Sequence, residues 1–195
     1  MAVISTDKNL EALTLTLVAE FDAGVERVWQ LWEDPRQLER WWGPPGWPAT
    51  FHKMDFVPGG RASYYMTGPG GEKAHGWWEF TAIEAPRRLQ FDDGFADSDG
   101  NPTGDLGTSH ATVTLEPAGE RTRMTIHSAF DAEEQMEQVM AMGMEEGLKL
   151  AVGQIDGILA EHANACRHAV ARNLLPDAGV GGRRRGPAVV GPSWR

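Results

Sequence analysis

Apolar and polar residues alternate along much of the chain, and this period of two predicts β-strands. The first strand covers Leu13 to Phe21, where every second residue from Leu13 onward is apolar. Six further strands are expected, over residues 52–56, 62–66, 75–84, 89–93, 111–115 and 124–130. Both faces of the 75–84 segment carry apolar residues, so the pattern does not decide which face of that strand is buried.

Helical spacing of apolar residues takes over in three places. Residues 25–32 predict one short helix, and Pro35 starts a second short helix that the Gly43-Pro44-Pro45-Gly46 turn stops. Near the end of the chain, a helical stretch over residues 133–142 is interrupted at Gly143. A longer amphipathic helix then runs from Met144 to about His162.

The order of these elements predicts an α+β fold. An antiparallel sheet must cover its apolar face, and one long amphipathic helix is the cover that this pattern offers. We therefore expect a strongly curved sheet of six to seven strands wrapped around the C-terminal helix, with two short helices after the first strand. Packing of this kind commonly leaves a cleft between sheet and helix.

Three segments are expected along the 195 residues. Residues 1–11 are predicted to be a flexible leader, residues 12–162 the folded domain, and residues 163–195 a basic, disordered tail. The tail carries a net charge of +5, within a chain whose net charge is −10, so the rest of the protein is strongly acidic. An acidic body repels phosphate backbones, which argues against a nucleic-acid partner for the folded domain.

Composition narrows the setting further. No run of 18 apolar residues predicts a membrane span, and the single cysteine, Cys166, fits a reducing compartment, so a cytoplasmic protein is expected. The chain holds eight tryptophans. One small core does not readily bury so many tryptophans. We therefore expect Trp47 and Trp77 to lie at the interface of a possible homodimer.

A set of short motifs, in order, resembles a known family. They are Phe21-Asp22-Ala23 leading into Val25-x-x-Val28-Trp29, then Asp34-Pro35, Leu38-x-x-Trp41-Trp42-Gly43-Pro44, Asp55-Phe56-x-Pro58-Gly59-Gly60, Gly68-Pro69-x-Gly71 and Ile83-Glu84-x-Pro86-x-Arg88-Leu89. Over roughly residues 12–162 the chain resembles the START-like, helix-grip superfamily. Within it, the chain looks most like the domain named for the C-terminal part of the activator of the heat-shock protein 90 ATPase.

This resemblance implies a helix-grip (START/Bet v-like) fold but does not fix an activity. Members of the superfamily resemble chaperone-stimulating domains, small-molecule binding proteins and, more distantly, polyketide cyclases and lipid carriers. The eukaryotic activator also has an N-terminal chaperone-binding domain, for which the segment before residue 12 is too short.

Aromatic and methionine side chains from the sheet and the last helices are expected to converge on one interior, where methionine adapts to ligands of varied shape. The predicted ligand-cavity residues are Met54, Phe56, Tyr64, Met66, Trp78, Phe80, Phe91, Met140, Met144 and Leu148.

Candidate catalytic chemistry is sparse. The six histidines and single cysteine show no paired metal-ligand spacing, and neither a metal nor a cofactor is expected. His52, in phase with Met54 and Phe56, and His75 are candidates for polar groups in the cavity. Asp93 shares its phase with Leu89 and Phe91, so burial would raise its pKa and make it a conceivable general acid.

The leading hypothesis is therefore a domain that binds a small hydrophobic or amphipathic molecule under the C-terminal helix. Two alternatives stay open. One is an enzyme of the cyclase or hydrolase type that uses cavity acids and histidines, and the other is a domain that regulates a chaperone or contacts another protein.

Overall fold

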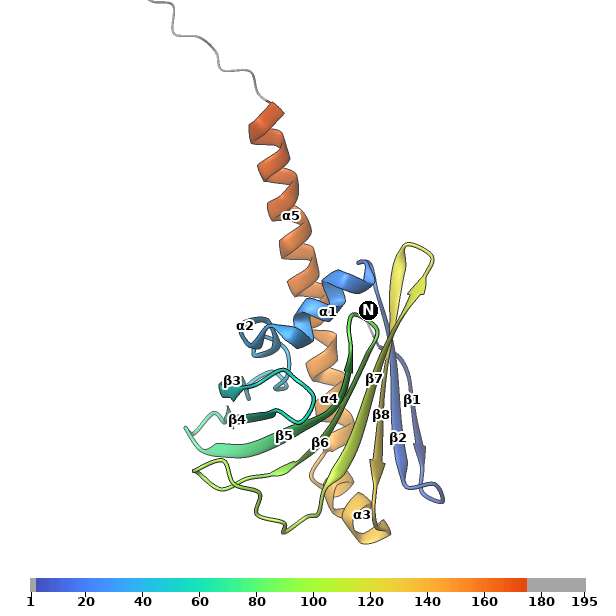
Figure 1. Ribbon diagram of the computed structural model, residues 1–195, viewed down its shortest axis with the longest axis vertical. Helices are drawn as coiled ribbons and strands as arrows, with labels where there is room; N and C mark the ends of the chain where they lie inside the picture. The colour runs from blue at the N-terminus through green and yellow to red at the C-terminus, as the bar shows by residue number, and fades with distance from the viewer. Residues whose placement is uncertain (1–2, 175–195) are drawn as a thin grey trace, which may run out of the picture.

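An eight-stranded antiparallel sheet dominates the computed structural model, which describes residues 3–174 (Figure 1). The strands are β1 (Val3–Asn9), β2 (Thr14–Phe21), β3 (Ala49–Met54), β4 (Arg61–Thr67), β5 (Lys73–Glu84), β6 (Arg88–Phe95), β7 (Ser109–Ala118) and β8 (Arg121–Phe130). The helices are α1 (Val25–Glu33), α2 (Pro35–Leu38), α3 (Glu133–Ala141), α4 (Met144–Gly153) and α5 (Ile155–Leu174).

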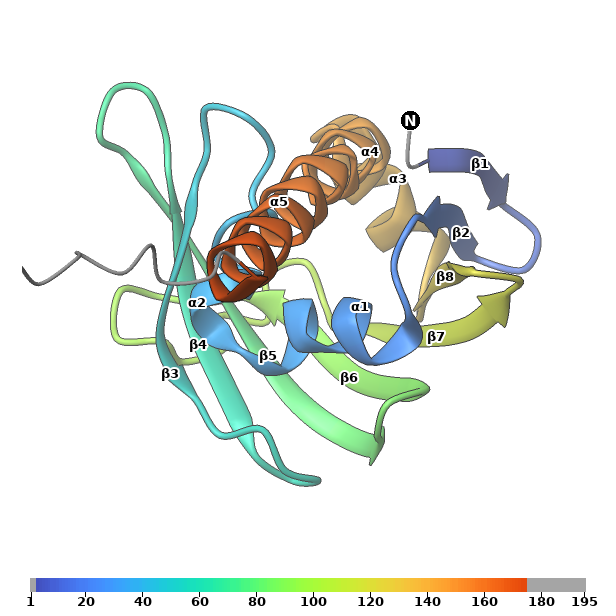
Figure 2. The same ribbon diagram turned by 90° about the horizontal axis from the view of Figure 1, so that it is seen from above.

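The sheet is strongly curved around the C-terminal helices. Its strand order is β1-β2-β8-β7-β6-β5-β4-β3, so every pair of neighbours is consecutive in the chain except β2 and β8. Seen from above, the strands form an arc around α4 and α5 (Figure 2). Helices α1 and α2 lie at one end of the sheet and α3 lies at the other (Figure 1). This is the α+β, helix-grip arrangement that the sequence predicts.

The concave face of the sheet carries the hydrophobic core. In β2 and β8, buried and partly exposed residues alternate without interruption. In β5, Trp78 and Phe80 are fully buried and Trp77 is partly exposed on the other face, which decides the face that the sequence leaves open. Burial of this apolar face is the main force that sets the strand register.

The prediction that residues 1–11 form a flexible leader is wrong for the residues that form β1. Val3–Asn9 pairs antiparallel with β2 at the edge of the sheet, which brings the number of strands to eight. The described side chains of β1 are almost all exposed, because an edge strand is held by backbone hydrogen bonds along one side. Its sequence consequently lacks an alternating apolar row.

The long C-terminal helix is broken into α4 and α5 at Gln154. The side-chain amide of Gln154 donates to the carbonyl oxygens of Trp41 and Gly43, at 3.2 and 2.8 Å, and ties the break to the turn after α2. Helix α5 continues to Leu174, so the boundary predicted at residue 162 falls inside a helix. The arginine cluster at 183–185 lies outside the described residues.

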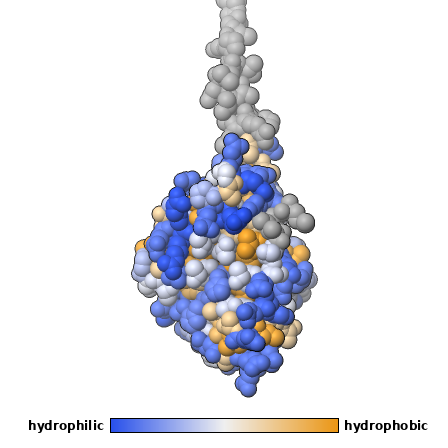
Figure 3. Space-filling model, turned by 90° about the vertical axis from the view of Figure 1, so that its right-hand side faces the viewer, coloured by the Kyte–Doolittle hydropathy of each residue, from blue (hydrophilic) through white to orange (hydrophobic). Residues whose placement is uncertain are grey.

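The face of the molecule shown in Figure 3 is largely hydrophilic, with hydrophobic residues in small separate areas. Among residues 3–174, no helix is both long and apolar enough to span a lipid bilayer.

Candidate functional site

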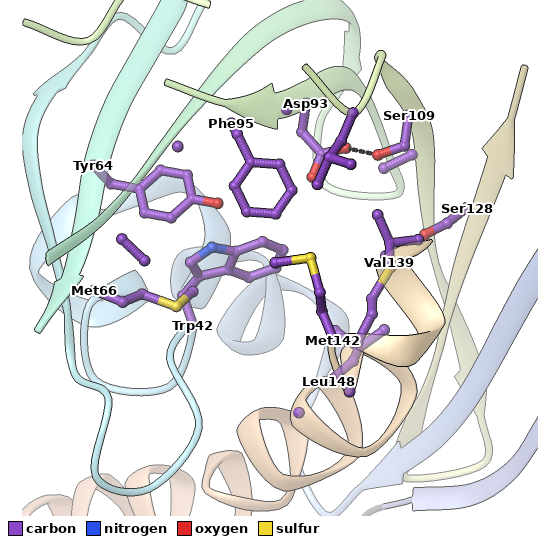
Figure 4. Close-up of a pocket in the computed structure, with 18 of the residues that line it drawn as sticks. Trp42, Tyr64, Met66, Asp93, Phe95, Ser109, Ser128, Val139, Met142 and Leu148 are labelled. Carbon is purple, nitrogen blue, oxygen red and sulfur yellow. Dashed lines mark hydrogen bonds between the residues drawn. The ribbon is translucent and has the colours of Figure 1, made fainter. Parts of the chain in front are cut away.

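A cavity of about 340 Å³ lies between the concave face of the sheet and helices α3 and α4. Strands β4 to β8 form one wall, and the α3–α4 segment forms the other. Trp42 and Pro44, from the turn after α2, close one side. Figure 4 shows the side chains of these elements pointing into a common space.

Five of the ten predicted cavity residues line this space, namely Tyr64, Met66, Phe91, Met144 and Leu148. The other five pack elsewhere. Trp78 and Phe80 are fully buried in the main core, which Met54 and Phe56 contact from its edge. Met140 instead packs in a separate cluster with Leu15, Phe130 and Met136.

Several other residues line the cavity that the sequence pattern did not predict. Phe95 and Ser109 lie one step of the alternation beyond the strands predicted over residues 89–93 and 111–115, whereas Ser128 lies on the inward face within the strand predicted over 124–130. Val139 comes from α3, whose apolar stripe is short, and Met142 follows the last residue of that helix. Trp42 is not among the predicted cavity residues either, although it forms part of the wall.

An aromatic cluster forms the wall near β4 and β5. The ring of Trp42 meets that of Trp78 edge to face, with centroids 4.7 Å apart, and Tyr64 stacks on Phe51 at 4.9 Å. The Tyr64 ring crosses directly over Gly76, where any Cβ would collide with it. Gly76 therefore allows the phenol to reach into the cavity. Burial, and then the charge of Asp93, raise the pKa of Tyr64, so its hydroxyl stays neutral.

Asp93 is the acidic residue of the cavity wall. Its neighbour across the β6–β7 ladder is Ser109, whose hydroxyl donates a hydrogen bond to the Asp93 carboxylate. Burial raises the pKa of Asp93 to about 6, against the smaller opposing effect of the Ser109 bond, and the nearby charge of Asp92 adds to the rise. The sequence prediction that Asp93 faces the cavity with a raised pKa is confirmed.

Two buried polar atoms of residues that line the cavity have no hydrogen-bond partner in the described protein. They are the indole N–H of Trp42 and the Nδ1 atom of His75. Buried polar atoms are nearly always hydrogen-bonded, so unpaired polar atoms beside a cavity are candidates to contact a bound molecule. Among the described residues that line the cavity, none is a lysine or an arginine.

The histidines do not form a cluster in this cavity. His52 is exposed, because a β-bulge between Phe51 and Lys53 changes the phase of β3 and turns the preceding Ala49 and Phe51 inward. The prediction that His52 shares an inward phase with Met54 is therefore wrong. The His75 ring contacts Tyr65, on the face opposite to Tyr64, although His75 also borders the cavity.

On the outer face of the sheet, His110 lies between two carboxylates. Its ring nitrogens are 2.7 Å from Asp92 Oδ1 and 3.3 Å from Asp131 Oδ1. The Asp92 hydrogen bond is the main reason why the pKa of His110 is raised. Within residues 3–174, no group of three or more His, Cys, Asp or Glu side chains is arranged to hold a metal ion.

Known structures share this architecture. The chain is similar to a protein from Arthrobacter aurescens solved by NMR, with 64% identity over 82% of this chain and 92% of that one, at a TM-score of 0.79. It is also similar to protein Ms6760 from Mycobacterium smegmatis, with 47% identity, coverage of 80% and 96%, and a TM-score of 0.76. No curated protein matches the chain.

A family model supports the same grouping. The model described as "Activator of Hsp90 ATPase homolog 1-like protein" matches residues 22–160, which is most of the domain formed by the sheet and its covering helices. The chain belongs to this family of activator of Hsp90 ATPase homolog 1-like proteins, within the START-like, helix-grip superfamily.

Proposed function

We propose that this domain binds a small hydrophobic or amphipathic molecule in the cavity between the sheet and α3–α4. The observation that carries the proposal is a cavity of about 340 Å³ with a mainly apolar wall and a few convergent polar groups. Ligand pockets have this character, and their volumes start at about 300 Å³.

The composition of the wall supports binding of a flexible range of ligands. Met66, Met142 and Met144 contribute unbranched, polarizable side chains that adapt to different shapes. Met142 is 63% exposed, so a large apolar side chain borders both the cavity and the solvent. Covering such a side chain with an apolar ligand is favourable in water.

Native mass spectrometry of protein purified from its own host is the direct experiment. We expect a non-covalent adduct of small mass that is lost on denaturation. Protein without any adduct, which also fails to bind an environment-sensitive apolar dye, would contradict the proposal.

An enzymatic role is the second candidate, and the raised pKa of Asp93 is the observation that favours it. A carboxyl group with a pKa of about 6 can give or take a proton near neutral pH. Incubation with candidate esters or polyketide-like compounds tests this role, with Asp93→Asn as the inactive comparison.

The chaperone role rests on the description of the family alone, and the cytoplasmic location rests on cysteine content.

A further inference from the structure

The carboxyl and hydroxyl groups of the cavity lie on the side of the sheet. Figure 4 shows the oxygen atoms of Tyr64, Asp93 and Ser128 on the side of the sheet, with Val139, Met142 and Leu148 on the side of the helices. An amphipathic ligand therefore has one favourable orientation, with its apolar body against the helices and its polar end against the sheet.

Asp93 has unused capacity to accept hydrogen bonds at this polar side. An ionised carboxylate offers about four acceptor positions. The structure shows one side-chain donor to Asp93, the Ser109 hydroxyl. Asp93 is partly buried, so its ionised form has a desolvation cost that the single Ser109 hydrogen bond offsets only in part.

No lysine or arginine lines the cavity opposite Asp93, and among the described lining residues the ionisable side chains besides Asp93 are Tyr64 of β4 and His75 of β5. Strand β4 brings the neutral Tyr64 hydroxyl, and α3 and α4 line the cavity with uncharged residues. The titratable neighbours Asp92 and His110 pair with each other on the outer face of the sheet. A positive charge on the ligand itself is the group that this arrangement lacks.

We infer that the cavity selects hydrophobic molecules that carry a protonated amine, with the ammonium group donating to Asp93. This inference rests on the proposed function and specifies the ligand class. Ammonium N–H groups fill the free acceptor positions of Asp93 and neutralise its charge at the same time. The aromatic rings of Phe91 and Phe95, two residues to either side on β6, add cation–π attraction.

The same geometry disfavours anionic amphiphiles such as fatty acids. A ligand carboxylate would lie beside Asp93 in a wall that contains no described lysine or arginine. Two like charges in a partly desolvated site repel strongly. A neutral alcohol, which can donate one hydrogen bond without a charge, should rank between the amine and the acid.

Three naphthalene compounds of similar size test this ranking by isothermal titration calorimetry on the full-length protein. They are 2-naphthylmethylamine, 2-naphthylmethanol and 2-naphthoate. At about pH 7.5 we expect the amine to bind about tenfold more tightly than the alcohol, and the acid to bind most weakly. A tenfold difference in affinity corresponds in free energy to a shift of one pKa unit. At about pH 5 the amine should lose about tenfold in affinity, because only about a tenth of a group with a pKa of about 6 is then ionised.

Asp93→Asn removes the charge with little change in shape, and it should abolish both the preference for the amine and its dependence on pH. Glu116→Gln is the matched control, since it removes one negative charge from an exposed position on β7 that does not line the cavity. The alcohol should bind Asp93→Asn about as well as the wild type.

Equal binding of the three compounds to the wild-type protein would overturn the inference and leave the proposed function intact, even if the Asp93 variant failed to fold. An amine preference that persists in folded Asp93→Asn would also overturn it. If none of the three compounds bound, the proposed function would fail together with the inference.

Discussion

Trp41→Ala is the substitution that should destabilise the fold most clearly. Trp41 is fully buried, and its ring meets that of Trp32 edge to face at a centroid distance of 4.7 Å. Removing a buried aromatic ring of this size costs about 3–5 kcal/mol of the free energy of unfolding. For a chain of this length the melting temperature should fall by roughly 6–20 °C.

Part of this cost comes from one hydrogen bond with a specific origin. The indole N–H of Trp41 donates to the carbonyl oxygen of Leu31 at 3.0 Å. In a continuing helix that carbonyl would accept from the residue four positions later, but this residue is Pro35, which has no N–H. Trp41 thus replaces the missing donor at the end of α1. Trp41→Phe keeps most of the packing and leaves this carbonyl without its donor, at a cost of about 1–3 kcal/mol.

Thermal unfolding followed by far-UV circular dichroism, together with urea titration, measures both variants. Trp77→Ala is the matched control, because Trp77 is partly exposed on the outer face of the sheet and should cost clearly less. A melting temperature unchanged by Trp41→Ala would refute the reasoning. A Trp41→Phe variant as stable as the wild type would refute the role assigned to the indole N–H.

Three further predictions concern the cavity and the C-terminal helix. Leu148→Arg should leave the protein folded but abolish binding of an apolar dye, because Leu148 lines the cavity. Leu150→Arg is the control and should change neither folding nor dye binding, because the Leu150 side chain is 49% exposed. Unfolding of Leu148→Arg would show that the site is a closed core. The pKa of Asp93 is raised from its ordinary value of 3.8 to about 6, so the folded state binds this proton more tightly than the unfolded state. The free energy of unfolding should therefore fall as the pH rises from about 4 to about 6. Urea titrations of Asp93→Asn should show that this part of the pH dependence is lost, and the same pH dependence in the variant would refute the prediction. Deleting residues 166–195 should leave the melting temperature and dye binding unchanged, because the buried residues described in α5 end at Leu159, and loss of folded protein would contradict this boundary.

The fold could be predicted because the strands that hold the core bury one face. In β2, β7 and β8 the burial pattern follows the alternation of the sequence residue by residue. Prediction failed where burial does not set the pattern. Strand β1 is an exposed edge strand, and the bulge in β3 depends on pairing with β4.

The site could be predicted less completely, because it depends on register and on contacts between distant elements. The phase of β6 indicates that Asp93 points inward, but its pairing with Ser109 requires the register of β6 against β7. Likewise, the sequence does not show that Gln154 holds the turn containing Trp42 and Gly43 against the helices. Aromatic and methionine residues are equally suited to core and cavity, which explains why only half of the predicted lining residues reach the cavity.

Two glycines, Gly143 and Gly147, form part of the helical wall of the cavity, and only the first is visible in the sequence as a helix interruption. Gly143 has a φ of 87°, a conformation that favours glycine, and it separates α3 from α4. Met142 and Met144 therefore lie on either side of a bend in place of one continuous apolar stripe, and both line the cavity. One turn later, Gly147 brings no side chain to the wall, and a Cβ at either glycine would have no neighbouring atom within 4 Å. The bend at Gly143 and the missing side chain at Gly147 leave open space at the helical wall of the cavity, which larger residues at these positions would occupy.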